Sequence, residues 1–464
     1  MQSLFESRVS FLSLAAAFAI AACSSDQHPS GGSDAGKTHP AEAGAGGAPS
    51  TDGGSADCDV TVAPSSNDLQ TIKDAIENKL KTGQTLCFSP GTYKLTDHVT
   101  LASSAQVTFR GTGSSRDDVV LDFTGQTNGD EGILVSTEGF TIENLSIKNT
   151  QGNGIKVQAD NSVFRNIKVG WDNTTPGDAG PTTGGYAIYP TGCNVTLMEN
   201  NEVYGAADAG IYAGQCKHVI ARNNDAHDNV LGIEVENTLG AEVYDNEVHG
   251  NTTGILLDLL PNLQQKTAED YYVHDNHVYE NNRRNDGQPN TLAATAPLGT
   301  GILVLASHDI EIAKNDIAGN SGVAVLIVSY DIIDLLAVAN GGTASTPDPT
   351  TSRWPRRIYV HDNVFSGNGG DPVGSYAVFG VASDGGQKTN PYDVAWDGIL
   401  DPNGYGDAGP ATAADAQICL GATEQKSFVD FQGQSAASLF DPSKWSTDTK
   451  PHQCTLPPIS PLTP

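Results

Sequence analysis

The sequence predicts an all-β fold in the form of a parallel β-helix, and three observations point to it. A Gly-Ile pair recurs every 22 residues, in "DAGIYAGQC", "LGIEVENTL" and "TGILLDLLP". A second short unit that contains Asn recurs between these pairs, and Gly and Asn fall where the chain would turn a corner. A period of about 21–25 residues made of short alternating strands is typical of a solenoid in which each repeat forms one coil.

The N-terminal sequence predicts that the protein is exported from the cytoplasm. Arg8 precedes the apolar run "FLSLAAAFAIAA", which is short for a membrane span and indicates a secretory signal over residues 1–23. "IAAC", Ile20 to Cys23, resembles the bacterial lipobox, which implies that Cys23 becomes the lipidated first residue. An ordinary cleaved signal with an incidental Cys is the alternative. No Asp follows Cys23 directly, which by resemblance to bacterial sorting patterns implies an outer membrane lipoprotein that faces the periplasm or the cell surface.

Three further regions follow the signal. Residues 24–57 are rich in Gly, Ala, Ser and Pro without large apolar side chains, so a disordered linker is expected. The β-helix is expected over residues 58–440. Residues 441–464 are expected to form a C-terminal tail tied to the domain by a disulfide.

A short helix is predicted at the start of the β-helix. "SNDLQTIKDAIENKLK" places Leu69, Ile72, Ile76 and Leu80 at helical spacing. The apolar face of this helix can cover the edge of the first coil, which would otherwise be open to pairing with another chain.

Two ladders of side chains are predicted within the coils. Side chains alternate along a strand, so the residue after each Gly is expected to face the interior. These interior residues are Ile155, Ile188, Ile211, Ile233, Ile255 and Ile302. The Asn residues at one corner are expected to hydrogen-bond their neighbours as a structural ladder rather than to act in catalysis. They are Asn201, Asn224, Asn246, Asn276, Asn315 and Asn363.

The six cysteines after Cys23 are expected to form disulfides, because an exported chain meets an oxidising compartment. Neighbours in the sequence are Cys58 with Cys87, Cys193 with Cys216, and Cys419 with Cys454. Six cysteines allow many pairings, so their order alone decides none of them. The separation of Cys193 and Cys216 is close to the coil period and is a stronger indication.

The chain is strongly acidic, with 55 Asp and Glu against 25 Lys and Arg and a formal net charge of −30. Such a surface repels phosphate backbones, which argues against nucleic acid as a partner. It also disfavours polyanionic glycans unless a metal ion bridges the two. No P-loop, HExxH or CxxC motif occurs in the sequence.

The chain resembles the right-handed parallel β-helix lipoproteins of Gram-negative bacteria, within the pectate-lyase-like superfamily. The resemblance rests on the N-terminal helix and on motifs in order: "SPGTY", "VTFRGTG", "GGYAIYP", "GAADAGIYAGQC", "GIEVEN", "GILLDLLP", "GTGILVLA" and "VLIVSY". It implies a single-stranded right-handed solenoid, attached to a membrane through the lipid anchor only. The wider superfamily includes polysaccharide lyases, epimerases and hydrolases. Cys193 and Cys216 stand where Ser is expected in the family, a paired change that supports a disulfide between coils.

A candidate site follows from the alternation along the middle strands. If Ile faces inward, the residue after it and the one two further on face outward, and both are expected in solvent. The outward carboxylates of Glu234, Glu236 and Asp258 are candidate catalytic groups, because strand spacings place them at the carboxyl separations of glycosidases. The candidate substrate-binding residues are Tyr189, Tyr212, Asp208, Gln215, Lys156 and Arg222. Asp208 and Arg222 could equally stabilise loops, and the whole row could be solvated surface.

Two functions of different class are therefore expected. The first is a cell-envelope protein that binds a polysaccharide or other envelope glycan and could also cleave or epimerise it. Hydrolysis suits these residues better than lyase chemistry, which needs a cation beside the uronate carboxylate. The same carboxylates could hold Ca²⁺, an ion that prefers oxygen ligands. The alternative is a non-catalytic surface protein that acts through protein–protein contacts.

Overall fold

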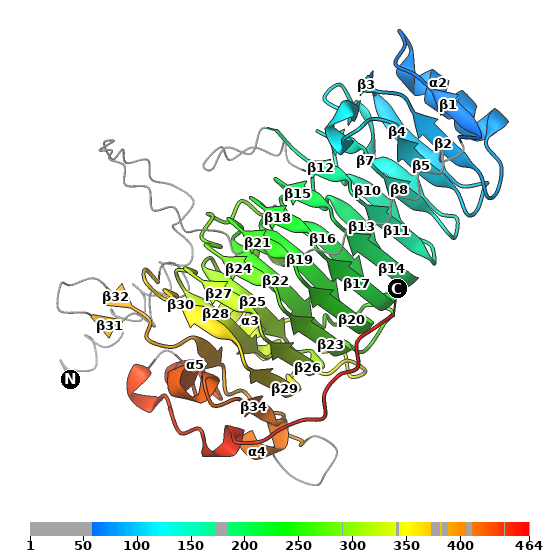
Figure 1. Ribbon diagram of the computed structural model, residues 1–464. Coiled ribbons are helices and arrows are strands. Elements are labelled where there is room, and N and C mark those ends of the chain that lie inside the picture. Colours follow the sequence, from blue (N-terminus) through cyan, green and yellow to red (C-terminus); the bar gives the residue numbers. More distant parts are fainter. Residues whose placement is uncertain are drawn as a thin grey trace, which may run out of the picture. The chain divides into compact units, whose positions relative to one another are not determined.

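Each sequence repeat forms one coil, and the strands of successive coils join three long sheets (Figure 1). Strands that are neighbours in these sheets pair in parallel, and they lie about one coil apart in the sequence. The computed structural model describes residues 58–172, 184–289, 291–339, 343–372, 381–382, 388–404, 411–439 and 441–463. The expected signal peptide, its Cys23 and the linker lie outside these residues. The parallel β-helix predicted from the repeat is confirmed.

Three parallel sheets contain nearly all of the described strands. The 12-stranded sheet contains, in spatial order, β1 (Val60–Val62), β2 (Thr85–Phe88), β5 (Thr108–Gly111), β8 (Thr141–Glu143), β11 (Ser162–Arg165), β14 (Asn194–Glu199), β17 (Lys217–Arg222), β20 (Leu239–Tyr244), β23 (Glu269–His274), β26 (His308–Ala313), β29 (Arg356–His361) and β34 (Ile418–Leu420). The 11-stranded sheet contains β4 (Asp97–Leu101), β7 (Asn128–Val135), β10 (Ile155–Val157), β13 (Ile188–Pro190), β16 (Ala209–Gly214), β19 (Leu231–Glu236), β22 (Thr253–Asp258), β25 (Thr300–Leu305), β28 (Val323–Val328), β33 (Val394–Trp396) and β35 (Phe428–Asp430). The 10-stranded sheet contains β3 (Gly91–Lys94), β6 (Val119–Asp122), β9 (Ser146–Lys148), β12 (Lys168–Gly170), β15 (Glu202–Tyr204), β18 (Asp225–His227), β21 (Glu247–His249), β24 (His277–Tyr279), β27 (Asp316–Ala318) and β30 (Val364–Ser366). A small hairpin of β31 (Val381–Ala382) and β32 (Lys388–Thr389) completes the described strands.

Helices are few and lie at the ends of the solenoid or in its inserted loops. They are α2 (Asp68–Asp74) with the following π-helical turn η1 (Ala75–Lys79), α3 (Asp331–Ala339), α4 (Ala413–Ala416) and α5 (Ala436–Leu439). Short 3-10 turns are η2 (Arg116–Asp118), η3 (Ala293–Thr295), η5 (Glu424–Ser427), η6 (Pro442–Lys444) and η7 (Lys450–His452). The predicted N-terminal helix is confirmed, and its apolar residues Ile72, Ile76 and Leu80 are buried. Of the helices in the described residues, none is long and apolar enough to cross a membrane.

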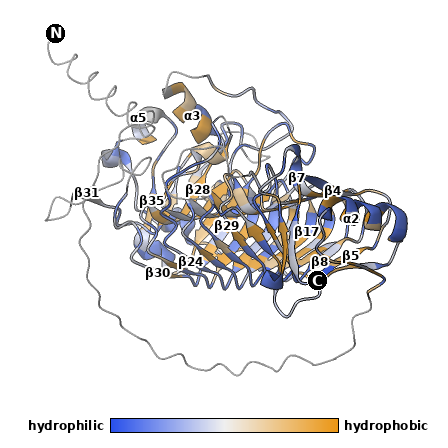
Figure 2. Ribbon diagram, turned by 90° about the horizontal axis from the view of Figure 1, so that it is seen from above, coloured by the Kyte–Doolittle hydropathy of each residue, from blue (hydrophilic) through white to orange (hydrophobic). Residues whose placement is uncertain are grey.

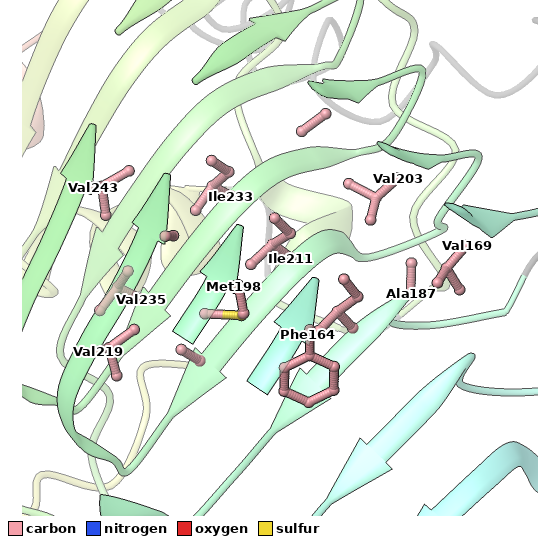
Figure 3. Close-up of a cluster of buried hydrophobic side chains, with 14 of the residues drawn as sticks. Phe164, Val169, Ala187, Met198, Val203, Ile211, Val219, Ile233, Val235 and Val243 are labelled. Atoms are coloured by element: carbon pink, nitrogen blue, oxygen red, sulfur yellow. The ribbon is translucent and has the colours of Figure 1, made fainter. Parts of the chain in front are cut away.

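The interior of the coils is apolar, as the alternation predicts. Ile211, Ile233 and Ile255 lie in register on β16, β19 and β22 and are almost fully buried. Figure 3 shows Ile211 and Ile233 on successive strands, with Met198 among the side chains that fill the space between sheets. Apolar residues concentrate in the strands and on part of α3, and most turns are polar (Figure 2). Burying such side chains contributes roughly 1.5–3 kcal/mol each to folding.

The predicted Asn ladder is present at the corner between the 12-stranded and 10-stranded sheets. The backbone N–H and side-chain amide of Asn246 both donate to Oδ1 of Asn276, at 3.1 and 2.8 Å. Asn276 repeats the arrangement with Asn315 on the next coil. A second ladder, which the sequence pattern did not predict, lies at the corner between the 10-stranded and 11-stranded sheets. Its members are Asn229, Asn251, Asn281, Asn320 and Asn368.

The cysteines are disulfide-bonded as expected. Cys193 and Cys216 lie on adjacent coils and are joined, and Cys419 is joined to Cys454 in the tail. Cys58 and Cys87 are each disulfide-bonded as well. The link between Cys419 and Cys454 fixes the start of the final segment of the chain on β34.

Candidate active site

The candidate residues lie on the outer face of the 11-stranded sheet, but the structure corrects the expectation that they are in solvent. Tyr212 on β16, Glu234 and Glu236 on β19, and Asp258 on β22 point away from the coil interior. Their exposed fractions are nevertheless only 4%, 3%, 8% and 0%. The outward face of these strands is therefore a second buried layer.

Inserted loops cover this face with apolar side chains. Leu256, Leu303 and Leu305 continue the outward row on β22 and β25, and all three are buried in a second apolar cluster. Side chains from the loops between coils pack against that cluster, among them Leu292 and Ile332. Helix α3 is held by Arg353, which pairs with Asp331 and Asp334. Sequence alternation identified the outward side but could not show that distant segments fold over it.

Three of the candidate carboxylates converge within this layer. One oxygen from each of Glu234, Glu236 and Asp258 lies within 4.8 Å of the others. Glu236 and Asp258 are direct partners on neighbouring strands, and Glu234 stands two residues before Glu236 on β19. Both carboxylate oxygens of Asp258 and Oε2 of Glu234 have no hydrogen-bond partner among the described residues. Burying carboxylate oxygens without hydrogen-bond partners costs folding free energy. Protonation or a bound cation would lower that cost.

Three tyrosines stand beside the carboxylates. Tyr212 donates a hydrogen bond of 2.6 Å from its hydroxyl to Oε1 of Glu236. The ring of Tyr212 lies 4.6 Å from that of Tyr186 and 4.9 Å from that of Tyr189, measured between centroids. Tyr186 and Tyr189 are half-buried, so they connect the buried carboxylates with the molecular surface.

Gly214 leaves the space that the side chain of Tyr212 occupies. A Cβ atom at position 214 would lie 1.9 Å from the hydroxyl oxygen of Tyr212. We expect Gly214→Ala to displace the ring, break the bond to Glu236 and destabilise the fold by about 1–3 kcal/mol through overpacking. Urea unfolding measures the loss. Gly125→Ala is the control, because a Cβ there meets only one atom, at 3.8 Å; equal losses in the two variants would contradict the proposed role of Gly214.

Burial raises the pKa values of all four acids of the site. The pKa values of Glu234 and Asp258 are raised well above their ordinary range, by burial first and by neighbouring carboxylates second. Burial also raises the pKa of Glu236, against the lowering effect of the Tyr212 hydrogen bond. The pKa of the half-buried Asp208 rises to about 7, through burial and the charge of Glu236, although a hydrogen bond with Tyr186 opposes the shift. These shifts favour the protonated, proton-donating form of the acids.

Stability should fall as pH rises when no divalent cation is present. Between the ordinary carboxyl pKa of about 4 and the pKa of about 7 for Asp208, the folded protein binds more protons than the unfolded chain. Buried Asp397, with a pKa raised to about 7, acts in the same direction, whereas His308, with a pKa lowered to about 4, acts against it. Melting temperatures in EDTA should therefore decline from pH about 5.5 to about 7.5, above the range in which carboxyl groups with lowered pKa values, such as Glu202, act in the opposite direction. A melting temperature that rises across this range would contradict the assignment.

The other predicted binding residues are only partly brought together. Lys156 lies beside the site, with Nζ 5.1 Å from the ring centroid of Tyr189 and 3.5 Å from Oε1 of Glu131. Gln215 instead accepts the backbone N–H of Gln264 and so helps to hold the loop after β22. The side chain of Gln215 therefore stabilises the loop after β22.

Arg222 does not belong to the site that the sequence predicted for it. It lies on β17 of the 12-stranded sheet, where its guanidinium pairs with Glu199 and donates to the hydroxyl of Tyr244. The residue belongs to a different face from the carboxylate cluster because each coil contributes strands to three sheets. Grouping it with Tyr189 and Glu234 was wrong for that reason.

Two residues of the site were missed. Tyr186 stands just before β13 and packs on both other tyrosines, and Gly214 gives Tyr212 its position. The motif "GGYAIYP" contains both Tyr186 and Tyr189, so two aromatic residues beside one strand were a usable signal. Nothing in the sequence alone marks Gly214 as different from the many other glycines at corners.

Comparisons with known proteins found one family model and several solved structures that are similar to this chain. A family model described as a right-handed beta helix region matches residues 178–340, in the central coils. The A-module of mannuronan C-5 epimerase AlgE4 from Azotobacter vinelandii is similar with a TM-score of 0.48 and 14% identity, over 74% of this chain and 89% of that chain. A polygalacturonase from Erwinia carotovora gives a TM-score of 0.45 and 11% identity, over 67% and 92%. An alginate lyase from Paenibacillus sp. gives 0.42 and 14%, over 66% and 96%. No curated protein matches the sequence.

The chain is thus a right-handed parallel β-helix protein with a buried carboxylate cluster on the outer face of one sheet. The fold expected from the resemblance to the pectate-lyase-like superfamily is confirmed.

Proposed function

We propose that this protein binds a polysaccharide beside the 11-stranded sheet and acts on it through acid–base chemistry of Glu234, Glu236 and Asp258. The observation that carries the proposal is the convergence of these three buried carboxylates within 4.8 Å of one another, two of them with unpartnered oxygens. Such an arrangement costs folding free energy, and it is typical of sites that bind a ligand or catalyse a reaction.

The spacing favours one geometry of glycoside hydrolysis over the other. Inverting glycosidases separate their two carboxyl groups by roughly 6.5–9.5 Å to admit a water molecule, and retaining enzymes by roughly 5–5.5 Å. Oxygens within 4.8 Å of one another are closer to the retaining arrangement. In that arrangement a protonated carboxyl donates to the leaving oxygen while an ionised neighbour attacks, and the raised pKa values supply the proton donor. We propose Glu236 as the ionised member because the Tyr212 hydroxyl stabilises its carboxylate.

The same residues fit a calcium ion. Ca²⁺ binds oxygens at about 2.3–2.6 Å, so two ligand atoms of one ion can lie as far as about 5 Å apart. Oxygens of Glu234, Glu236 and Asp258 within 4.8 Å of one another satisfy that limit, and their missing partners leave them able to coordinate. A bound Ca²⁺ would neutralise the carboxylate of an acidic sugar. The cluster would then suit an acidic polysaccharide, whereas the protonated cluster suits a neutral one.

The half-buried residues around the cluster indicate where a sugar would contact the protein. Tyr186, Tyr189 and Asp208 are each partly exposed beside the buried carboxylates. Aromatic rings present apolar surface to the faces of sugars, and Asp208 can accept hydrogen bonds from hydroxyl groups. Lys156, which contacts Tyr189, adds one positive charge at the edge of this surface.

A glycan panel with two arms tests the proposal. Purified protein is incubated with neutral and uronate-containing polysaccharides, in EDTA or in Ca²⁺, and new reducing ends and unsaturated products are measured separately. We expect reducing ends without unsaturated products, and loss of this activity in Glu236→Gln but not in Glu247→Gln, whose carboxylate is exposed on β21 of the 10-stranded sheet. Absence of both cleavage and glycan-dependent thermal stabilisation across the panel would overturn the proposal and favour a protein-binding role.

We also propose that the protein is held at the outer membrane by lipid on Cys23, facing the periplasm or the cell surface. The support is the apolar run that ends at Cys23 and the polar residues that follow it. Metabolic labelling with a fatty acid should mark the wild-type protein and leave Cys23→Ser unlabelled. Recovery of labelled Cys23→Ser would contradict the anchor.

A further inference from the structure

The C-terminal strap, residues 455–463, lies along the outer face of the 12-stranded sheet. It follows Cys454, which is bonded to Cys419 on β34, and Figure 1 shows it running past β29, β26 and β23 toward β17. The backbone N–H of Ile459 donates to Oε2 of Glu311 and that of Leu462 to Oε2 of Glu242, both at 2.7 Å. The strap forms neither helix nor strand.

The strap has a three-residue period. Its sequence reads Leu-Pro-Pro, Ile-Ser-Pro, Leu-Thr-Pro from Leu456 onward. Leu456, Ile459 and Leu462 are half-buried, whereas every other residue of the strap is exposed. Burial of one residue in three is expected of a polyproline II helix, which has three residues per turn and is favoured by the fixed φ of proline.

The period of the strap matches the spacing of the strands beneath it. Glu311 on β26 and Glu242 on β20 are two strands apart, with β23 between them. Two strand spacings are about 9.6 Å, and three residues of polyproline II rise about 9.3 Å. Every third N–H of such a peptide can therefore meet a carboxylate on every second strand.

Each of these two carboxylates is oriented by the same set of neighbours. The sequence Tyr-Val-His-Asp-Asn occurs twice, from Tyr272 on β23 and from Tyr359 on β29. In the first copy His274 lies 3.1 Å from Oε1 of Glu242, its other ring nitrogen lies 2.7 Å from Asp275, and Tyr272 stacks on it.

The second copy repeats these contacts around the other carboxylate. His361 lies 3.2 Å from Oε1 of Glu311, its other ring nitrogen lies 2.9 Å from Asp362, and Tyr359 stacks on it. In both copies one carboxylate oxygen is held by histidine and the other faces the strap. The surface that contacts the strap is therefore organised by side chains that belong to the sheet and not to the strap.

We propose that this face of the 12-stranded sheet is a recognition surface for polyproline II peptides with a Leu/Ile-x-Pro repeat, and that the strap is its resident ligand. Recognition comes from two carboxylates that accept backbone N–H groups three residues apart and from contact with branched apolar side chains at the same positions. Proline between these positions holds the peptide extended and removes donors that would find no partner. This recognition surface is separate from the carboxylate cluster, which lies on the 11-stranded sheet.

A labelled peptide tests the recognition surface in the full-length protein. Ile459→Asp with Leu462→Asp places like charges against Glu311 and Glu242, which should free the strap while the Cys419–Cys454 bond remains. A fluorescein-labelled peptide of sequence TLPPISPLTP should then bind this variant about tenfold or more tightly than the wild type, whose tethered strap competes at an effective concentration of about 1 mM. Adding Glu242→Ala and Glu311→Ala should remove binding, whereas adding Glu247→Ala should not.

Two further outcomes would overturn the proposal. One is a folded strap-free variant, checked by its melting curve, that fails to bind the peptide at about 1 mM or binds a scrambled peptide without the proline period equally well. The other concerns the rates of amide hydrogen exchange in the wild-type strap. The amides of Ile459 and Leu462 should exchange slowly, and the exposed Ser460 between them should exchange fast. Equal exchange at the three positions would show that the strap is held by its disulfide alone.

Discussion

Asp258→Asn should abolish ligand binding and at the same time make the protein more stable at neutral pH. The carboxylate of Asp258 is fully buried, has no hydrogen-bond partner among the described residues and lies beside two other acids. Asparagine has nearly the same volume, cannot ionise and can donate to a neighbouring carboxylate. We expect a gain of about 1 kcal/mol in the free energy of unfolding in EDTA at neutral pH, because folding of the variant no longer has to bury this acid at the cost of taking up a proton.

Catalytic rate and calcium affinity should both fall in the same variant. Loss of an acid or base typically lowers a rate by about 10²–10⁴-fold, and loss of one carboxylate weakens a calcium site that is built from the three clustered carboxylates. Calorimetry with Ca²⁺ and the glycan assay measure the two effects, and Glu247→Gln is the control for a carboxylate outside the cluster. A variant that is both destabilised and fully active would show that Asp258 is scaffold. The sequence alone predicts little change in melting temperature, because alternation places the side chain in solvent.

Asn276→Ala should strongly destabilise the protein, because it removes one member from the middle of the first Asn ladder. Oδ1 of Asn276 accepts the backbone N–H and the side-chain amide of Asn246, and its own amide donates to the carbonyl of Val243 and to Oδ1 of Asn315. All of these groups are buried, so alanine leaves several without a partner. Each buried unsatisfied group costs about 1–3 kcal/mol, and we expect a total loss of about 3–5 kcal/mol.

The matched control for this replacement is Asn282→Ala. Asn282 also makes side-chain hydrogen bonds, to the Gly319 carbonyl and the Ser321 N–H, but it is exposed and water can replace its contacts. Its loss should stay below about 1 kcal/mol. Equal midpoints of urea unfolding for the two variants would show that the ladder merely accompanies the fold without stabilising it.

The predicted and observed sites share their residues but differ in their exposure to solvent. Alternation along β19 correctly placed Glu234 and Glu236 on the outward side, opposite Ile233, and register correctly brought Asp258 beside Glu236. Alternation is a local property of a strand, so it could be predicted from the spacing of a few residues. It could not reveal that Leu292 and Ile332 come from remote loops to pack over the same face.

The strap shows the same limit from the other end of the chain. Its proline content and the spacing of Leu456, Ile459 and Leu462 are visible in the sequence, yet they predict only a tail. Glu242 and Glu311 are separated from it by more than a hundred residues, so no local pattern connects them. Their role as acceptors for the strap became apparent only when β20 and β26 were placed two strands apart.

The sequence by itself determined the coil: the repeat length, the inward isoleucines, the first Asn ladder and the Cys193–Cys216 bond. These features depend on a residue's place within one repeat and on its equivalent in the next, and periodicity preserves both. Only the tertiary structure decided which outward faces are exposed and where Arg222 points. Those outcomes depend on contacts between segments whose separation follows no period, and burial rather than residue type then sets whether a carboxylate is solvated surface or a reactive group.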